Sequence, residues 1–270
     1  MKPAIKVLGV PDDINSSFMR GSSAAPPLIR EALYSASSNL FSESGLNLDQ
    51  KGIWEDLGDI EFAGQVAVEN FKKIKTFVKD VLVSDQKLVS LGGDHSVSWP
   101  ILDAHLDIWD ALDILHIDAH PDLYDSLLGN KLSHASPFAR IMETGRASRL
   151  VQVGIRTLNK HQREQAEKFG VEIYQMEDLT KLSSLSFSKP VYCSIDIDAL
   201  DPAYAPGVSH FEPGGLSTRQ LIDCLNGFKG RLIGADIVEY NPTRDFHNLT
   251  AMVAAKLLKE VIARIYHDNS

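Results

Sequence analysis

The stretch ALDILHIDAHPD, residues 111–122, decides the fold that this sequence predicts. Its first seven residues form a mainly apolar run, which is typical of a strand buried inside a sheet. Asp118, His120 and Asp122 follow at alternate positions. Because alternate side chains of an extended chain point the same way, we expect these three to converge at the carboxyl end of the strand. Ligands of open α/β sheets bind at that end, so a metal site is expected there, with a plain polar loop as the alternative.

Apolar runs that predict strands alternate with segments of helical spacing along the rest of the chain. This alternation predicts a three-layer α/β/α fold with a mainly parallel central sheet and helices on both faces. No linker or internal repeat interrupts it, so we expect a single domain over residues 1–270. The expected strands are 5–10, 53–58, 88–91, 111–117, 150–155, 171–174, 190–197 and 231–238, and the expected helices are 28–35, 66–82, 97–109, 136–143, 160–169, 217–228 and 250–266.

The composition excludes several classes of function. With 36 acidic against 27 basic residues the net charge is −9, which argues against binding to nucleic acid and is compatible with a cationic substrate. No apolar run reaches the roughly 18 residues that a membrane span needs. Cys193 and Cys224 show no metal-site spacing and are expected to be buried, reduced thiols. A reducing, cytoplasmic location is therefore expected.

Three further polar clusters follow apolar runs. His95 ends the turn GGDH at 92–95, Asp196 and Asp198 repeat the alternate spacing, and Glu239 follows the last predicted strand. Taken singly, each has a plain interpretation: a glycine-rich turn with a chance histidine, an Asx-turn at Asp201, and a surface carboxylate.

Taken together, the clusters supply four carboxylates and two imidazoles, which is more than one ion needs. Two divalent ions that share bridging carboxylates use that number, and such pairs activate water for hydrolysis. The six predicted metal ligands are His95, Asp118, His120, Asp122, Asp196 and Asp198.

These clusters resemble the signature motifs of the ureohydrolases, the family of arginases and agmatinases. The resemblance covers nearly the whole chain and is greatest to plant-type arginases. It is carried by GGDHS at 92–96, DAHPD at 118–122, DIDALDP at 196–202 and Glu239, and by NSSF at 15–18, GNK at 129–131, SHAS at 133–136, APGVSH at 205–210, EPGG at 212–215 and TAMVAAK at 250–256.

The resemblance implies an arginase-like fold and two Mn²⁺ ions per subunit, with Ni²⁺ and Co²⁺ as other metals to test. Asp118 and Asp196 would bridge the ions. His95 and Asp122 would complete one ligand set, and His120 and Asp198 the other.

The resemblance also implies the cleavage of a guanidino group to urea and an amine, most plausibly of L-arginine to L-ornithine. A hydroxide held by the metals would attack the guanidinium carbon. Asp122 would carry its proton, His134 would handle the proton near the leaving amine, and Glu239 would hold the guanidinium, a planar cation that a carboxylate orients well.

The far end of the substrate is less defined. Tyr124 stands where animal arginases carry an asparagine, and His210 stands where many members carry threonine. Tyr124, Asn130, Asn159 and His210 are therefore candidate substrate contacts. Agmatine, which would give putrescine and urea, or another guanidino acid is an alternative substrate.

Two remoter alternatives are a single-metal, deacetylase-like hydrolase and a non-catalytic relative. Both predict fewer metal ligands than the six present. The resemblance further implies a homo-oligomer, a trimer or hexamer, and the chain lacks the long N-terminal extension of plant enzymes, which favours the cytoplasm. The remaining histidines are expected to be structural or solvated; they are His105, His116, His161, His247 and His267.

Overall fold

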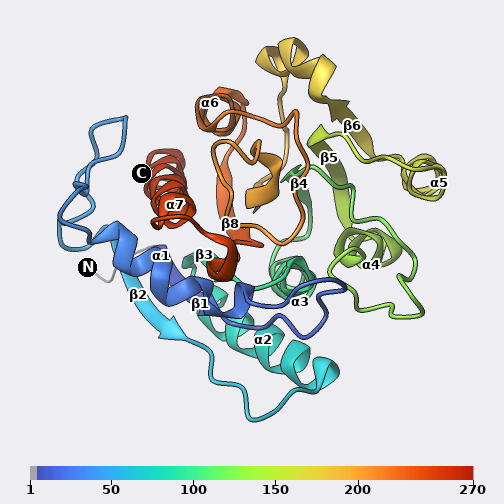
Figure 1. The fold of residues 1–270 in the computed structure, drawn as a ribbon, viewed down its shortest axis with the longest axis horizontal. Coiled ribbons are helices and arrows are strands. Elements are labelled where there is room, and N and C mark those ends of the chain that lie inside the picture. Colours follow the sequence, from blue (N-terminus) through green and yellow to red (C-terminus); the bar gives the residue numbers. More distant parts are fainter. Residues whose placement is uncertain (1–4, 270) are drawn as a thin grey trace.

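The computed structural model describes residues 5–269 and is built on one sheet of eight strands (Figure 1). The strand order is β2-β1-β3-β8-β7-β4-β5-β6, and every pairing between neighbours is parallel, which confirms the expected sheet. The strands are β1 (Ile5–Val10), β2 (Trp54–Asp59), β3 (Lys87–Gly92), β4 (Leu112–Ile117), β5 (Ala147–Ile155), β6 (Glu172–Gln175), β7 (Val191–Asp196) and β8 (Leu232–Val238).

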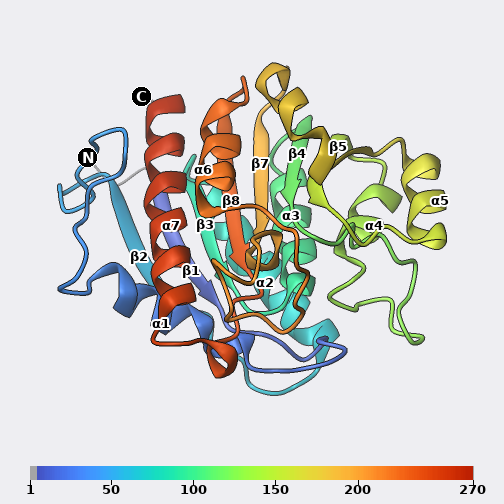
Figure 2. The same cartoon turned by 45° about the horizontal axis from the view of Figure 1, so that its top comes forward.

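Helices cover both faces of the sheet, as the alternating pattern predicts (Figure 2). One apolar core packs α1, α6 and α7 against the sheet, and a second core packs α2, α3, α4 and α5 against the other face. Among residues 5–269, no helix combines the length and the apolar character that a membrane span requires. The α-helices are α1 (Ala25–Leu33), α2 (Ala67–Leu82), α3 (Ser98–Leu106), α4 (Pro137–Glu143), α5 (Lys160–Phe169), α6 (Thr218–Gly227) and α7 (Leu249–Asp268).

Two segments differ from the sequence-based expectation. The helix expected over 97–109 begins as a 3₁₀ turn, η2 (His95–Val97), because the Asp94 side chain accepts the Ser96 N–H, and α3 ends at Leu106. The segment η3 (Met176–Ser184), for which we predicted no element, is a 3₁₀ helix that begins with a capping box. Short 3₁₀ segments of this kind show little hydrophobic periodicity in the sequence. The other 3₁₀ turns are η1 (Ser22–Ala24), η4 (Ile197–Ala199) and η5 (Pro242–Arg244).

The four central strands, β3, β8, β7 and β4, are neighbours in the sheet. Each is followed directly by one of the polar clusters singled out in the sequence. Because parallel strands end at the same edge, clusters that are up to 144 positions apart in sequence meet there, as the bond from the His95 N–H to the Glu239 carboxylate shows.

Gly93 allows the loop that follows β3 to close on the loop that follows β1. A Cβ at this position would lie 2.1 Å from the backbone oxygen of Asp12, while the Gly93 carbonyl accepts the N–H of Glu239 at 2.8 Å. Any side chain here must push apart the loops that follow β1 and β3.

Gly93→Ala should therefore lower the free energy of unfolding by about 1–3 kcal/mol, the usual cost of overpacking. Thermal unfolding measures the change. Gly227→Ala is the matched control, because a Cβ on that helical glycine meets nothing within 4 Å. Equal stability of both variants and the parent would contradict the close approach.

Candidate metal centre

The imidazole of His95 points into a group of three carboxylates at the carboxyl edge of the sheet. Its Nδ1 lies 3.2 Å from Asp118 Oδ2, 3.1 Å from Asp122 Oδ2 and 3.1 Å from Asp196 Oδ2. This buried nitrogen has no hydrogen-bond partner of good geometry among the described residues. An unpartnered nitrogen that faces three buried carboxylates fits a bound cation.

A second imidazole faces the same group from the other side. His120 Nδ1 lies 3.1 Å from Asp198 Oδ2 and 3.4 Å from Asp118 Oδ1. Asp118 thus presents one oxygen to each histidine. The structure brings all six predicted ligands together, with Asp118 between the two halves.

The route by which these side chains converge differs from the expected extended chain. β4 ends at Ile117, and Asp118 Oδ1 then accepts the His120 N–H at 2.6 Å, which turns the backbone. Asp196 Oδ1 accepts the Asp198 N–H in the same manner at 2.7 Å. Asp122 has a φ of 50°, in the left-handed region. The alternate spacing therefore brings the side chains together through Asx-type turns that begin where the strands end, and not through extended chain.

The carboxylates are in electrostatic conflict when only protein groups face them. Burial raises the pKa of Asp196 well above its usual range, and the charges of Asp198 and Asp118 raise it further. Burial also raises the pKa of Asp198, to about 6. For His95, burial opposes the charged form, yet the surrounding carboxylates raise its pKa well above the ordinary value. The cluster thus attracts positive charge, which a divalent cation supplies more fully than a proton.

A cavity of about 190 Å³ opens beside the cluster. That volume suits a small metabolite rather than a drug-sized ligand. No lysine or arginine is found among the described residues that line it. The lining consists of Ser17, His120, Asp122, Tyr124, Leu127, His134, Ala135, Thr157, Gln162, Asp196, Asp198, His210 and Glu239.

His134 and Glu239 form a buried pair at this cavity. His134 Nδ1 lies 3.2 Å from Glu239 Oε1, and Nε2 lies 2.8 Å from Ser17 Oγ. Burial alone would lower the pKa of His134, but Glu239 outweighs it and raises the pKa to about 9. Glu239 has a φ of 63°, so its backbone also lies in the left-handed region. The pair can hold and release a proton beside the candidate metal ligands.

The four candidate substrate contacts divide into two groups. Tyr124 and His210 line the cavity, and the His210 ring stacks on His134 at 5.3 Å between centroids. Asn130 donates to Asn15 Oδ1 and accepts the Leu132 N–H, so both ends of its amide are occupied. Asn159 caps α5 and donates to the Tyr124 hydroxyl. Neither asparagine lines the cavity.

Periodicity and spacing give no signal for several residues of the site, although Asn15 and Ser17 lie in the motif NSSF that carries part of the family resemblance. Ser17 reaches His134 from the loop after β1, and Asn15 in the same loop bonds Asn130. His116, expected to be structural or solvated, is buried in β4, with its Nε2 2.7 Å from Asp118 Oδ2 and its Nδ1 3.0 Å from the Gln152 amide nitrogen. These roles come from pairing across the sheet, which local periodicity does not encode.

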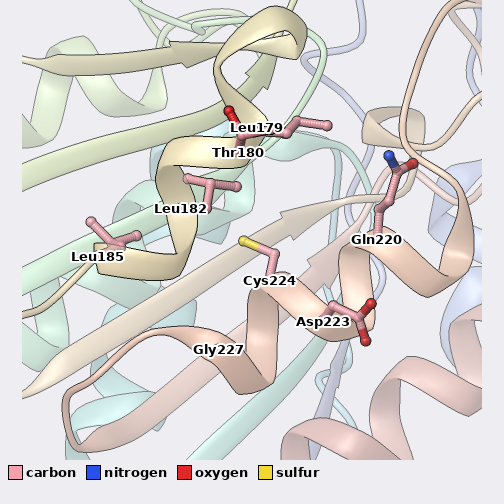
Figure 3. Close-up of a pocket in the computed structure, with 8 residues that line it drawn as sticks. All are labelled: Leu179, Thr180, Leu182, Leu185, Gln220, Asp223, Cys224 and Gly227. Carbon is pink, nitrogen blue, oxygen red and sulfur yellow. The ribbon is translucent and has the colours of Figure 1, made fainter.

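A second cavity, of about 380 Å³, lies between η3 and α6 and holds none of the predicted site residues (Figure 3). Three leucines and the buried thiol of Cys224 form much of its wall, and Gln220 and Asp223 lie on its α6 side. Burial raises the pKa of Cys224 to about 12, so the thiol stays protonated and unreactive.

Comparisons of sequence and of structure identify known proteins that are similar to this chain. The sequence model of the arginase family matches residues 3–263. The chain is 47% identical to arginase 1, mitochondrial, of Oryza sativa over 98% of its own length and 82% of the relative's. It is 33% identical to an agmatinase of Bacillus cereus over 96% and 90%. The solved structure of an arginase from Medicago truncatula superposes with a TM-score of 0.92, at 45% identity, over 97% of this chain and 87% of that one.

The raised pKa of His134 predicts that the folding stability of the metal-free protein depends on pH. Because the folded-state pKa, about 9, lies above the ordinary 6.5, the charged histidine stabilises the fold fully below pH 6.5, and this contribution is lost as the pH rises through 9. Glu239→Gln should move the pKa back towards 6.5 and remove this dependence. Carbon-13 NMR titration of the histidines and thermal unfolding between pH 6 and 9 measure both. An unchanged His134 titration in the variant would contradict the pairing.

Proposed function

We propose that this chain, which belongs to the arginase family, hydrolyses L-arginine to L-ornithine and urea. The observation that carries the proposal is the convergence of two imidazoles and four carboxylates beside a cavity that contains the His134–Glu239 pair. The anionic site matches a cationic guanidinium. The arginase names of the plant relatives support L-arginine as the substrate.

Two Mn²⁺ ions per subunit form part of the proposal. His95 and Asp122 would bind one ion and His120 and Asp198 the other, with Asp118 and Asp196 shared. Asp118 supports this division, because its two oxygens face different histidines. Mixed imidazole and carboxylate ligands suit manganese.

The metal pair would activate a water molecule near neutral pH. Glu239 would orient the guanidinium by accepting N–H groups on lone pairs that its bonds to His134 and His95 leave free. Asp122, which lines the cavity, would accept the proton of the attacking water. His134 would donate a proton to the amine nitrogen as the carbon–nitrogen bond breaks, and Ser17 holds the ring from its other nitrogen.

Agmatine, or another guanidino acid, is the second candidate substrate. A specific observation favours agmatine: none of the described residues that line the cavity is a lysine or arginine to pair with the α-carboxylate of arginine. Apart from the histidines, the donors of the described lining are neutral groups such as Ser17, Tyr124, Thr157 and Gln162. Cleavage of agmatine would give putrescine, a polyamine precursor, and urea.

The two remoter hypotheses fit the site less well. A single-metal, deacetylase-like hydrolase needs fewer ligands than the six that converge, and a non-catalytic relative would have lost some of them. Metal analysis separates all three, because they predict two, one and no ions per chain.

The assembly and location remain part of the proposal. We expect a homo-oligomer, a trimer or hexamer, of single-domain subunits that span residues 1–270; light scattering after gel filtration measures its mass. Two buried, unpaired cysteines support a reducing compartment such as the cytoplasm. The rice relative is named mitochondrial, and cell fractionation would distinguish the two locations.

His95→Ala and Asp122→Ala should each lower urea release from arginine at least 100-fold, because each removes a ligand from the same ion, and should reduce bound manganese. A colorimetric urea assay and elemental analysis measure the two effects. His267→Ala is the matched control, since this exposed histidine bonds Ser44 far from the site. Full activity of the Asp122 variant would refute the assigned site.

A substrate panel of arginine, agmatine, guanidinobutyrate and guanidinoacetate, tested with Mn²⁺, Ni²⁺ and Co²⁺, should give the highest kcat/KM for arginine with Mn²⁺. Agmatine should be cleaved measurably, because no lysine or arginine among the described wall residues requires an α-carboxylate. If agmatine is cleaved faster, the substrate assignment is wrong, while the hydrolysis of guanidines stands.

A further inference from the structure

A buried chain of hydrogen bonds runs from the inside of the sheet to His95. Asp236 on β8 is fully buried, and Ser194 on β7 is its direct neighbour in register. Ser194 Oγ donates to Asp236 Oδ1 at 2.6 Å, and the Tyr192 hydroxyl donates to Oδ2 at 2.8 Å. Ser194 Oγ also lies 3.0 Å from Nε2 of His95.

The direction of this chain follows from counting protons. A hydroxyl carries one hydrogen, and a carboxylate can only accept. The hydrogen of Ser194 is directed to Asp236, so its oxygen must accept the N–H of His95 Nε2. A neutral imidazole has one N–H, so Nδ1 is left with a lone pair, directed at Asp118, Asp122 and Asp196.

We propose that Asp236 is a positioning residue that acts through Ser194, fixing the tautomer and orientation of His95 so that Nδ1 binds the metal ion. Tyr192 would hold the second oxygen of Asp236. The inference rests on the proposed metal pair and is independent of which guanidine is the substrate. Outer partners of this kind typically change metal affinity by about 10–100-fold.

The effect should be confined to one ion. His120 is not connected to this chain: its Nε2 faces Glu212 Oε1 at 3.5 Å. Breaking the Asp236 chain should therefore lower the affinity for the ion bound by His95 and leave the affinity for the ion bound by His120 nearly unchanged.

The same row of the sheet offers a matched control. Ser90 on β3 is the register partner of Asp236 on its other side and is as fully buried as Ser194. Its hydroxyl makes no hydrogen bond among the described residues. Ser90→Ala removes the same atom from the same row without breaking the chain.

The test is a manganese titration of metal-free protein, followed by elemental analysis and Mn²⁺ electron paramagnetic resonance. Asp236→Asn is the sharpest variant, because its amide can donate to Ser194 and thereby reverse the chain, which would place the proton on His95 Nδ1. Asp236→Asn and Ser194→Ala should lower the affinity for one of the two ions about 10–100-fold. At limiting manganese they should also abolish the spin coupling between the ions. Tyr192→Phe should lower this affinity less, and Ser90→Ala should leave it unchanged.

Titrations of Asp236→Asn and Ser194→Ala that match the parent would overturn the inference. So would an equal loss in Ser90→Ala, which would assign the effect to packing. Circular dichroism identifies any variant that fails to fold, and Ser194→Cys, which keeps a weaker donor, should then give an intermediate affinity. If the parent binds both ions yet releases no urea from arginine, the proposed substrate fails and this inference is unaffected.

Discussion

Four carboxylates buried within contact of two imidazoles are the constraint on which the rest of this structure depends. Buried like charges repel, and the low dielectric of a protein interior strengthens that repulsion. The pKa of Asp196, raised well above its usual range, shows the strain that this places on the protein groups alone. Four adjacent parallel strands hold the carboxylates in place, because each strand is paired along its length and buried from end to end. A rigid sheet can hold these repelling groups together, and the proposed pair of cations would relieve the repulsion.

Hydrogen bonds join the loops beyond the strand ends. Asn15 donates its N–H to Asp94 and its amide to Ser96, while it accepts from the Asn130 amide and from the His134 N–H. One asparagine thus links the loops that follow β1, β3 and β4. The wall that faces the substrate is therefore set by a residue that lies outside the cavity lining, and Ser17, two positions on, is thereby placed against His134.

Much of this arrangement could be predicted from sequence. All eight strands could be predicted. Continuous apolar character indicated the four central strands, which are buried throughout, whereas the edge strands β2 and β6 are partly exposed and were expected from shorter runs. The six candidate ligands could be predicted because each lies at a strand end or within a few residues of one. Local pattern could not assign the roles of Ser17, Asn15 and the Asp236 chain, since their partners lie up to 117 positions away and are fixed by strand order and register. The motif NSSF marked Asn15 and Ser17 only through the family resemblance. Asn130 and Asn159 show the converse: residues suited to bind a ligand can be occupied by their neighbours.

Anomalous diffraction at the manganese edge, from a crystal of the parent protein grown with Mn²⁺, tests the central claim most directly. The account predicts two peaks, one beside Nδ1 of His95 and one beside Nδ1 of His120, with Asp118 between them. A single peak, or peaks remote from these nitrogens, would contradict it.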